Sequence, residues 1–354
     1  MKGQVEYLRG KGFDVHIVSA PGKEQNAYPN KIVHAINMER EISLKQDLIS
    51  LFKMTKLFLK EKPFIVNSGT PKAGLIGTLA AFITRRPVRI YTVRGLRLET
   101  VKGLKYKILY AMEKLAMFCA TDVIAISESL KDKIVSLGLK ETGEIQVLGY
   151  GSSNGINLSD FSKSYNKIPN SIESQLENHF VLGYVGRIVK DKGIREVIES
   201  FRILQNKGYK TKLLIVGELE KDDSIDEEYY KFITKNKDVV LTGHVEQPVN
   251  YYNHMDVLLF PTYREGFGNV SIEAQALEIP VITSNATGAK DTVENERTGF
   301  IVEIGDYRTI ADKTESLIND ENLKIELGSS ARKRVAEKFD SQIIWKHLEI
   351  IYRN

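Results

Sequence analysis

Two glutamates stand eight residues apart in the segment PTYREGFGNVSIEAQALEIPVI, residues 261–282. Between Glu265 and Glu273 lies a Gly-Phe-Gly turn, and the residues that follow it have the pattern of a helix. Glycines allow a tight turn and a close approach of the backbone to a ligand. The amides at the start of the helix, together with its dipole, favour a bound phosphate. A carboxylate beside such a site suits hydroxyl groups, because a charged acceptor binds them strongly.

Phosphate on one side and hydroxyls on the other are the groups of a nucleotide sugar. The alternative interpretation is an ordinary strand-to-helix turn with a solvated Glu273. A second motif, YVGRIVKDKG at residues 184–193, favours the nucleotide sugar. Its strand is expected to end at Gly186, and Arg187 and Lys192 flank the loop that follows. Two such cations at the end of a strand can neutralise a diphosphate, although each could also be a solvated surface charge.

Short apolar runs alternate with helical patterns, such as those of residues 43–61 and 193–208, along most of the chain. This alternation predicts parallel sheets with helices on both faces. The number of runs exceeds one comfortable sheet, and the polar stretch 162–179 resembles a linker. We therefore expect an α/β protein of two Rossmann-like domains with a cleft between them and ligands at the carboxyl ends of the strands. The eleven expected strands lie at residues 15–19, 64–67, 89–93, 123–127, 145–149, 180–186, 212–217, 239–243, 257–261, 280–284 and 300–303.

Composition excludes several classes of protein. The single cysteine, Cys119, excludes an intramolecular disulfide and a cysteine-based metal cluster. The start of the chain lacks the apolar core of a signal peptide, and no apolar run reaches the length of a transmembrane helix. The net charge of +4 hides an asymmetry, because residues 1–150 carry 24 Lys and Arg against 14 Asp and Glu. Residues 51–107 carry 13 basic residues against 2 acidic ones, which indicates either an anionic partner or a solvated basic surface.

The two motifs together resemble the retaining glycosyltransferases of family 4, which have the GT-B fold of two Rossmann-like domains facing each other across a cleft. Glu265 and Glu273 match the Glu-x7-Glu signature of that family. The stretches TDVIAISESL, GSSNGINLSDF, GHVEQP and NERTGFIV resemble the family as well. The resemblance implies an acceptor-binding domain over residues 1–163 and a nucleotide-sugar-binding domain over residues 164–340. It also implies a final helix, residues 341–354, that packs back on the first domain.

The resemblance further implies roles for single residues. Gly186, Arg187 and Lys192 would hold the donor diphosphate and stabilise the leaving nucleotide, with help from the backbone of Gly266, Phe267, Gly268 and Asn269. Glu265 would contact hydroxyls of the transferred sugar and Glu273 the ribose, while His244 and Val245 would line the nucleobase. No Asp-x-Asp occurs in the sequence, so we expect no metal and no cofactor: the cations would do the work of a metal, and the UDP-sugar is a substrate.

The first half departs from the family in two places. Arg94 stands where the family usually has a histidine in the cleft, and an arginine cannot act as a base because it stays protonated. It could still bind a phosphate or a developing charge. The chain also begins inside what resembles the family's first helix, so we expect about twenty residues, one strand and its loop, to be absent.

The family resemblance gives the basic block an interpretation. Residues 94–118 interleave Arg and Lys with Leu, Tyr and Ile, so they could lie on an anionic membrane or form a helix whose apolar face is core. We expect a cytoplasmic enzyme, peripheral on the inner membrane face, that moves a hexose or N-acetylhexosamine from a UDP-sugar to a polyprenyl-diphosphate-linked or other saccharide in capsule or O-antigen synthesis. The alternatives are a UDP-N-acetylglucosamine 2-epimerase-like isomerase and a non-catalytic nucleotide-sugar-binding protein, and no nucleic acid is expected. The basic residues assigned to the acceptor or membrane are Lys72, Arg97, Lys102, Lys105 and Lys107.

Overall fold

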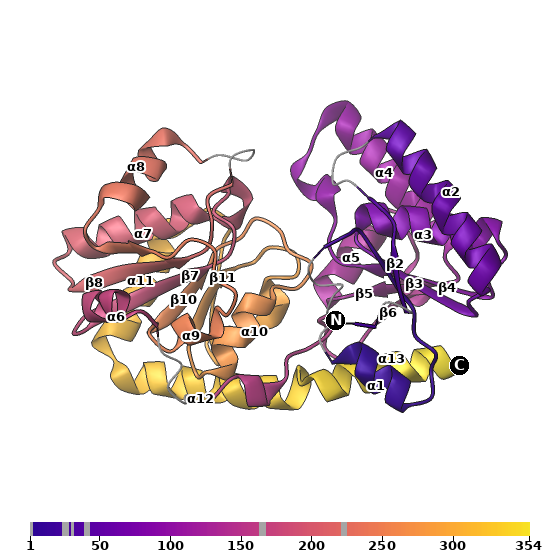
Figure 1. Ribbon diagram of the computed structural model, residues 1–354. Coiled ribbons are helices and arrows are strands. Elements are labelled where there is room, and N and C mark those ends of the chain that lie inside the picture. Colours follow the sequence, from indigo (N-terminus) through magenta and orange to yellow (C-terminus); the bar gives the residue numbers. More distant parts are fainter. Residues whose placement is uncertain (1–2, 23–27, 30–31, 39–42, 163–167, 221–224) are drawn as a thin grey trace. The chain divides into compact units, whose positions relative to one another are not determined.

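The computed structural model describes residues 3–22, 28–29, 32–38, 43–162, 168–220 and 225–354. The chain forms two compact units: unit 1 is Met1–Asn154 with Ser341–Asn354, and unit 2 is Gly155–Asp340 (Figure 1). The boundary expected between residues 163 and 164 lies outside the described residues. The division falls earlier because Ile156 already belongs to unit 2, where its amide donates to the Phe339 carbonyl at 3.0 Å. Phe161 likewise packs against a hydrophobic core of unit 2.

The described residues of unit 1 form two separate parallel sheets. The larger sheet has four strands in the order β3 (Ile65–Gly69), β4 (Val88–Val93), β5 (Asp122–Ala125) and β6 (Ile145–Val147). The smaller sheet pairs β1 (Ile17–Ser19) with β2 (Val33–Ala35). β2 is missing from the strands expected from the sequence.

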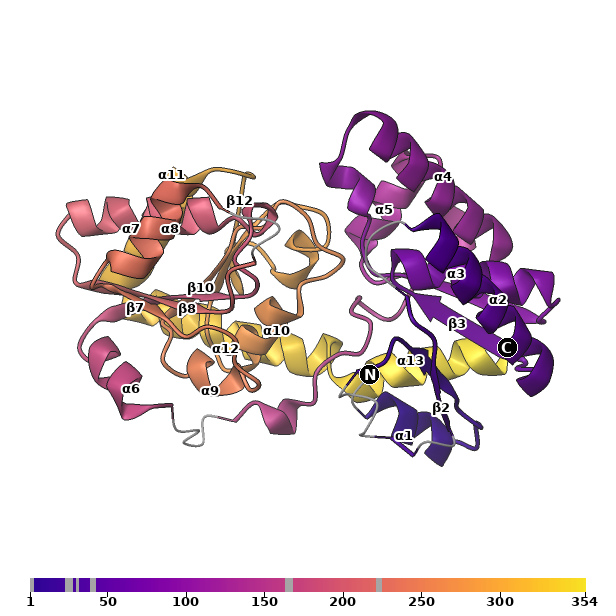
Figure 2. The same cartoon turned by 45° about the horizontal axis from the view of Figure 1, so that its top comes forward.

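Helices cover both faces of the four-stranded sheet. On one face, α2 (Leu44–Glu61) packs on α3 (Pro71–Ile83), which packs in turn on α4 (Gly103–Cys119) (Figure 2). Small residues let α3 lie close to the strands: a Cβ on Gly74 would collide with the Tyr91 ring of β4. On the other face, Leu8 of α1 (Gln4–Gly10) and Leu348 of α13 (Ser341–Arg353) share a core with strand residues. The last α-helix of unit 1's first segment is α5 (Glu128–Ser136).

Unit 2 is a six-stranded parallel sheet in the order β12-β11-β10-β7-β8-β9. This is the doubly wound arrangement in which the strand order reverses between the first strand and the fourth, here β7 and β10. Parallel strands need crossover connections, and helices supply most of them. The strands are β7 (Phe180–Val185), β8 (Thr211–Val216), β9 (Val239–Leu241), β10 (Val257–Phe260), β11 (Val281–Ser284) and β12 (Gly299–Val302).

Two hydrophobic cores of unit 2 lie on opposite faces of this sheet. One joins α7 (Ile194–Asn206) and α11 (Tyr307–Asn319) to the strands, and the other joins α6 (Asn170–Leu176), α9 (Val249–Tyr252) and α10 (Asn269–Ala276). The long helix α12 (Glu321–Lys338) packs on α10, and α8 (Glu227–Lys235) packs beside β9. Every residue of β8, β10 and β11 is buried, which explains why these strands read as continuous apolar runs in the sequence.

Candidate active site

The strand order of unit 2 creates a ligand position at one edge of its sheet. Ligands of doubly wound sheets bind beyond the carboxyl ends of the strands, where the order reverses. Here the reversal lies between β7 and β10, and the two motifs found in the sequence are the loops that follow these two strands. Gly186, which follows β7, has a φ of 146°. A Cβ on Gly217, at the end of neighbouring β8, would collide with the Gly186 carbonyl, so the backbones approach closely there.

The two cations of the first loop that were assigned to the donor, Arg187 and Lys192, lie at this edge and both face carboxylates. Arg187 is exposed and pairs with Glu220 at 2.8 Å. Its carbonyl accepts a hydrogen bond from the Tyr184 hydroxyl at 2.7 Å, which anchors the start of the loop. Lys192 forms an ion pair with Glu265 of the second loop, and their side chains are 19% and 22% exposed. The structure therefore brings together two residues 73 positions apart that the sequence assigned to one ligand.

Asp191 joins the two loops, and sequence reasoning missed it. Its carbonyl accepts hydrogen bonds from the Tyr263 amide at 2.9 Å and the Thr262 hydroxyl at 3.1 Å. Its carboxylate pairs with Arg264 at 2.9 Å. Neither Asp191 nor Arg264 carries a signal in the sequence beyond adjacency to Lys192 and Glu265, because their pairing exists only once β7 and β10 are neighbours.

The glycine-rich loop places the start of α10 beyond the end of β10. Gly268 has a φ of 94°, a conformation that a side chain would strain, and a Cβ there would also lie 2.6 Å from the Phe260 ring. Gly266 and Phe267 are buried, and the side chain of Asn269, the first residue of α10, is exposed. Since α10 starts at the carboxyl edge of the sheet, its N-terminal dipole points toward the ligand position.

The two glutamates of the motif have different partners. Glu265 faces the Lys192 cation, whereas Glu273 accepts a hydrogen bond from the Tyr252 hydroxyl at 2.9 Å. Burial raises the pKa of Glu273, and the bond from Tyr252 offsets part of that shift. Tyr252, from α9, is a further site residue that the sequence did not indicate. Glu265 is therefore held by an ion pair, and Glu273 is held by a hydrogen bond from a neutral hydroxyl.

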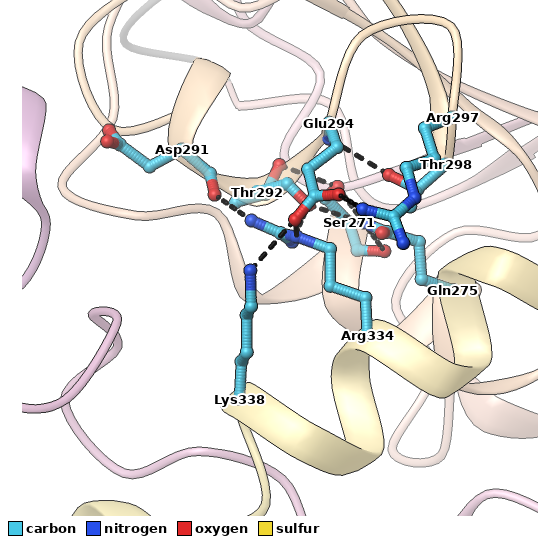
Figure 3. Close-up of polar contacts among 9 residues, drawn as sticks. All are labelled: Ser271, Gln275, Asp291, Thr292, Glu294, Arg297, Thr298, Arg334 and Lys338. Carbon is cyan, nitrogen blue, oxygen red and sulfur yellow. Dashed lines mark hydrogen bonds and ion pairs between the residues drawn. The ribbon is translucent and has the colours of Figure 1, made fainter.

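A polar network anchors α10 to α12 (Figure 3). Gln275 donates to the Thr292 carbonyl at 2.8 Å, and the Thr292 hydroxyl donates to the Ser271 hydroxyl at 2.8 Å. Arg334 of α12 donates to Glu294 at 3.0 Å, and it also donates to the carbonyls of Thr292 and Asp291. α10 is thereby tied to α12 through the segment that precedes β12.

Aromatic contacts extend the same support to the glycine-rich loop. The Arg334 guanidinium lies 4.8 Å from the Phe339 ring, and Phe339 meets the Phe267 ring edge-on at 5.1 Å. Phe267, proposed for its backbone, is thus also an apolar anchor of the loop. The two nucleobase candidates follow β9, which β7 and β8 separate from β10. His244 is exposed, and Val245 is half-buried against a hydrophobic core.

Arg94 lies in unit 1, at the carboxyl end of β4. Its side chain is exposed and passes over Gly69 at the end of β3, where a Cβ would come within 2.8 Å of its Nε. Nearby, Asn67 donates to the Tyr352 hydroxyl at 2.8 Å and accepts from the Thr92 hydroxyl at 2.8 Å. Burial raises the pKa of Tyr352 to about 12.

The basic residues assigned to the acceptor or membrane divide into two groups. Lys72, at the start of α3, pairs with Asp47 at 2.8 Å, and only 12% of its side chain is exposed. It therefore contributes to the packing of α2 on α3 and differs from the open basic surface expected from the sequence. The exposed group consists of Arg97, Lys102, Lys105 and Lys107, which lie before or in the first turns of α4.

The described residues contain neither a candidate metal cluster nor a candidate membrane span. Over this part of the chain, no cluster of three or more His, Cys, Asp or Glu side chains could hold a metal ion. None of the described helices is both long enough and apolar enough to cross a membrane.

Comparison with known proteins identifies the family. The family model for glycosyl transferases group 1 matches residues 167–334, and the model for glycosyl transferase 4-like domains matches residues 1–127. A capsular polysaccharide biosynthesis glycosyltransferase, CapM of Staphylococcus aureus, is 63% identical over 99% of this chain and 93% of its own length. The chain belongs to the group 1 glycosyltransferases. Both the family and the GT-B fold expected from the motifs are confirmed.

One more distant relative and two solved structures extend the comparison. The UDP-Gal:α-D-GlcNAc-diphosphoundecaprenol α-1,3-galactosyltransferase of Escherichia coli is 27% identical over 95% of this chain and 88% of its own length. Among solved structures, sucrose-phosphate synthase from Thermosynechococcus elongatus has a TM-score of 0.80 at 20% identity, covering 99% of this chain and 91% of its own. Anabaena HepE in complex with UDP and glucose has a TM-score of 0.74 at 20% identity, covering 94% and 88%. At these identities the two structures show the shared fold.

Proposed function

We propose that this glycosyltransferase moves a hexose or N-acetylhexosamine from a UDP-sugar to a lipid-linked saccharide, with retention at the anomeric carbon, in the synthesis of a bacterial capsule. One observation carries the donor assignment: Arg187, Lys192, Glu265 and the start of α10 converge where the strand order of unit 2 reverses. Cations and helix amides suit a diphosphate, and carboxylates suit the hydroxyls of two sugars. The names of the staphylococcal and Escherichia coli relatives support the capsular role and the lipid-linked acceptor.

The chemistry follows from where charge develops. The bond between the anomeric carbon and the UDP oxygen breaks while the acceptor oxygen bonds to the same face of the sugar. Negative charge then grows on the diphosphate, where Lys192, Arg187 and the α10 amides stabilise it without a metal ion or cofactor. The acceptor proton passes to the leaving diphosphate, because Arg94 cannot accept it. Arg94 instead binds a phosphate of the acceptor.

The remaining assignments complete the donor site. Glu265 accepts hydrogen bonds from hydroxyls of the transferred sugar. One carboxylate oxygen of Glu273 accepts a hydrogen bond from a ribose hydroxyl, while Tyr252 donates to the other. His244 and Val245 line the uracil. The enzyme is peripheral on the inner face of the cytoplasmic membrane, where the exposed cations Arg97, Lys102, Lys105 and Lys107 lie near a polyprenyl-diphosphate acceptor.

A panel of UDP- and GDP-sugars tests the donor assignment. Calorimetry should show binding of one or a few UDP-sugars, and turnover should require a polyprenyl-diphosphate saccharide. Conversion of a UDP-sugar without any acceptor would favour an isomerase. Binding without turnover on any lipid-linked saccharide would favour a non-catalytic binding protein.

A further inference from the structure

The helix α2 exposes a row of large apolar side chains that no part of the described chain covers. Leu44, Leu48 and Phe52 follow one another at four-residue intervals, and Leu59 rejoins them after two further turns, so all four lie on one side of the helix. Large apolar groups gathered on one helix side usually mark an interaction surface. Their exposures are 78%, 66%, 71% and 57% in the order Leu44, Leu48, Phe52 and Leu59.

Lysines form a second row beside the apolar one. Lys45, Lys53 and Lys60 each directly follow an apolar residue of the first row, so they are displaced from it by one step of about 100° around the helix. Lys56 lies in the same row, four residues before Lys60. All four lysines are exposed.

The third side of α2 holds the helix on unit 1. Met54 and Phe58 are buried in a core shared with α3 and β3, and the Ser50 hydroxyl donates to the Asn37 carbonyl at 2.6 Å. The helix thus has a buried side, an apolar exposed side and a basic exposed side. Its acidic residues do not neutralise the basic row as a whole, because Asp47 pairs with Lys72 and Glu61 pairs with Lys60 alone.

We propose that this exposed side of α2, formed by Leu44, Leu48, Phe52, Leu59 and the lysines beside them, docks on an anionic membrane surface. Apolar side chains next to a basic row match the boundary between acyl chains and anionic headgroups. A second copy of the chain fits less well, because an antiparallel two-fold pairing of the helices would set the lysine row of one α2 against that of the other. The inference rests on the proposed lipid-linked acceptor, and it gives the main membrane contact to α2 instead of the start of α4.

Cosedimentation with vesicles tests the proposal on the full chain. Wild type should pellet with phosphatidylcholine–phosphatidylglycerol vesicles at low salt, stay in solution with pure phosphatidylcholine vesicles, and detach partly in 1 M salt, where the Debye length is about 3 Å. Leu48→Ser with Phe52→Ser should weaken binding at least about tenfold. Lys45→Gln with Lys53→Gln and Lys56→Gln should weaken it about 100-fold, since each lysine contributes about fivefold.

Matched controls come from unit 2 and from α4. Ile325→Ser removes an apolar side chain that is 59% exposed on α12, and Lys210→Gln with Lys235→Gln and Lys237→Gln removes three exposed charges. Both should bind vesicles like wild type. Lys102→Gln with Lys105→Gln and Lys107→Gln should weaken binding less than the α2 lysine variant does.

Two outcomes would overturn the proposal: wild type that ignores anionic vesicles at low salt, and α2 variants that bind as wild type does. The first outcome would assign the α2 surface to a protein partner. UDP binding and transfer to a detergent-solubilised acceptor report on the donor site separately. If they fail while vesicle binding follows the α2 pattern, the proposed function is wrong and the docking surface stands.

Discussion

Lys192 and Glu265 form an ion pair across the two loops of the donor site, and each has a different task once a nucleotide sugar is bound. Under the proposed function, the lysine charge serves the diphosphate and the carboxylate serves a sugar hydroxyl, so the donor would enter between them. An ion pair held in this way keeps both groups at the ligand position before binding, which lowers the cost of ordering them.

Replacement of Lys192 by alanine tests the cation directly. Lys192→Ala should lower turnover by roughly two orders of magnitude, the scale for removal of one preorganised donor, and should also weaken UDP binding. Lys190→Ala is a matched control two residues away, because Lys190 is 60% exposed and pairs with Asp226 outside the site. Steady-state kinetics and calorimetry on both variants measure the difference. Equal activity of the two variants would refute the role of Lys192.

The two glutamates should respond differently to amide replacement. Glu273→Gln should weaken binding of free UDP about tenfold or more, because a ribose contact to a charged acceptor is present with and without the sugar. Glu265→Gln should leave free UDP binding nearly unchanged and lower turnover to a degree that depends on the sugar of the donor. Calorimetry with UDP and kinetics with two UDP-sugars separate the roles, and equal losses of UDP affinity would contradict them.

Glu113 gives unit 1 a stability that depends on pH. This buried carboxyl accepts from the Tyr91 hydroxyl at 2.8 Å, and burial raises its pKa from 4.5 to about 7. The folded state therefore keeps a proton that the unfolded state loses, so this contribution is full below pH 4.5 and disappears as the pH rises to 7. The shift corresponds to about 3 kcal/mol.

Urea unfolding at several pH values measures this effect. In wild type, the free energy of unfolding should fall between pH 4.5 and 7 relative to Glu113→Gln, which keeps an acceptor for Tyr91 but does not titrate. Parallel pH curves for the two proteins would show that Glu113 does not hold the proton.

At the scale of elements, the position of α10 decides whether the glycine-rich loop can bind a phosphate. α10 is short, and its support comes from α12 through Arg334, Glu294 and Thr292 (Figure 3). Burial lowers the pKa of Arg334, and Glu294 offsets part of that shift. The network thus stabilises the buried charge of Arg334, because a carboxylate and backbone carbonyls accept its hydrogen bonds.

Arg334→Met should destabilise unit 2 by about 2–3 kcal/mol, because Glu294 loses a partner and two backbone carbonyls lose their donor. Arg297→Met is the matched control: Arg297 pairs with the same glutamate at 3.0 Å but is 74% exposed, and its loss should cost a small fraction of that. Thermal unfolding of both variants with and without UDP measures the difference. Similar melting temperatures for the two variants would assign the stability of α10 to its apolar contacts.

Most elements of the fold could be predicted from the sequence, while their arrangement could not. Buried strands such as β8 and β10 are largely apolar runs, so the sequence pattern finds them, whereas β2, none of whose residues is fully buried, is not found. The order of strands depends on crossovers that a single sequence does not reveal. For that reason Arg187, Lys192 and Glu265 could be named from their motifs, but Asp191 and Arg264 could not, because they pair between loops that only the sheet order makes neighbours. Tyr252 could not be named either, because its hydrogen bond to Glu273 joins helices on either side of β10 in the chain and no motif marks it.

At the scale of the whole molecule, the charge asymmetry follows the division into two units. The basic excess of residues 1–150 lies in unit 1, where α2 and the start of α4 carry exposed lysines. The family membership and the doubly wound sheet of unit 2 agree with a donor site in that unit. The proposed function accordingly assigns the acceptor and the membrane to unit 1 and the nucleotide sugar to unit 2.

We propose that sugar transfer from a UDP-sugar proceeds at the cations of unit 2 without a metal ion. The most direct measurement is UDP release by wild type in the presence of EDTA, with and without a polyprenyl-diphosphate saccharide. We predict release that depends on the acceptor, persists in EDTA, and yields a product with the anomeric configuration of the donor. Loss of release in EDTA that magnesium or manganese restores, or a product of inverted configuration, would contradict the account.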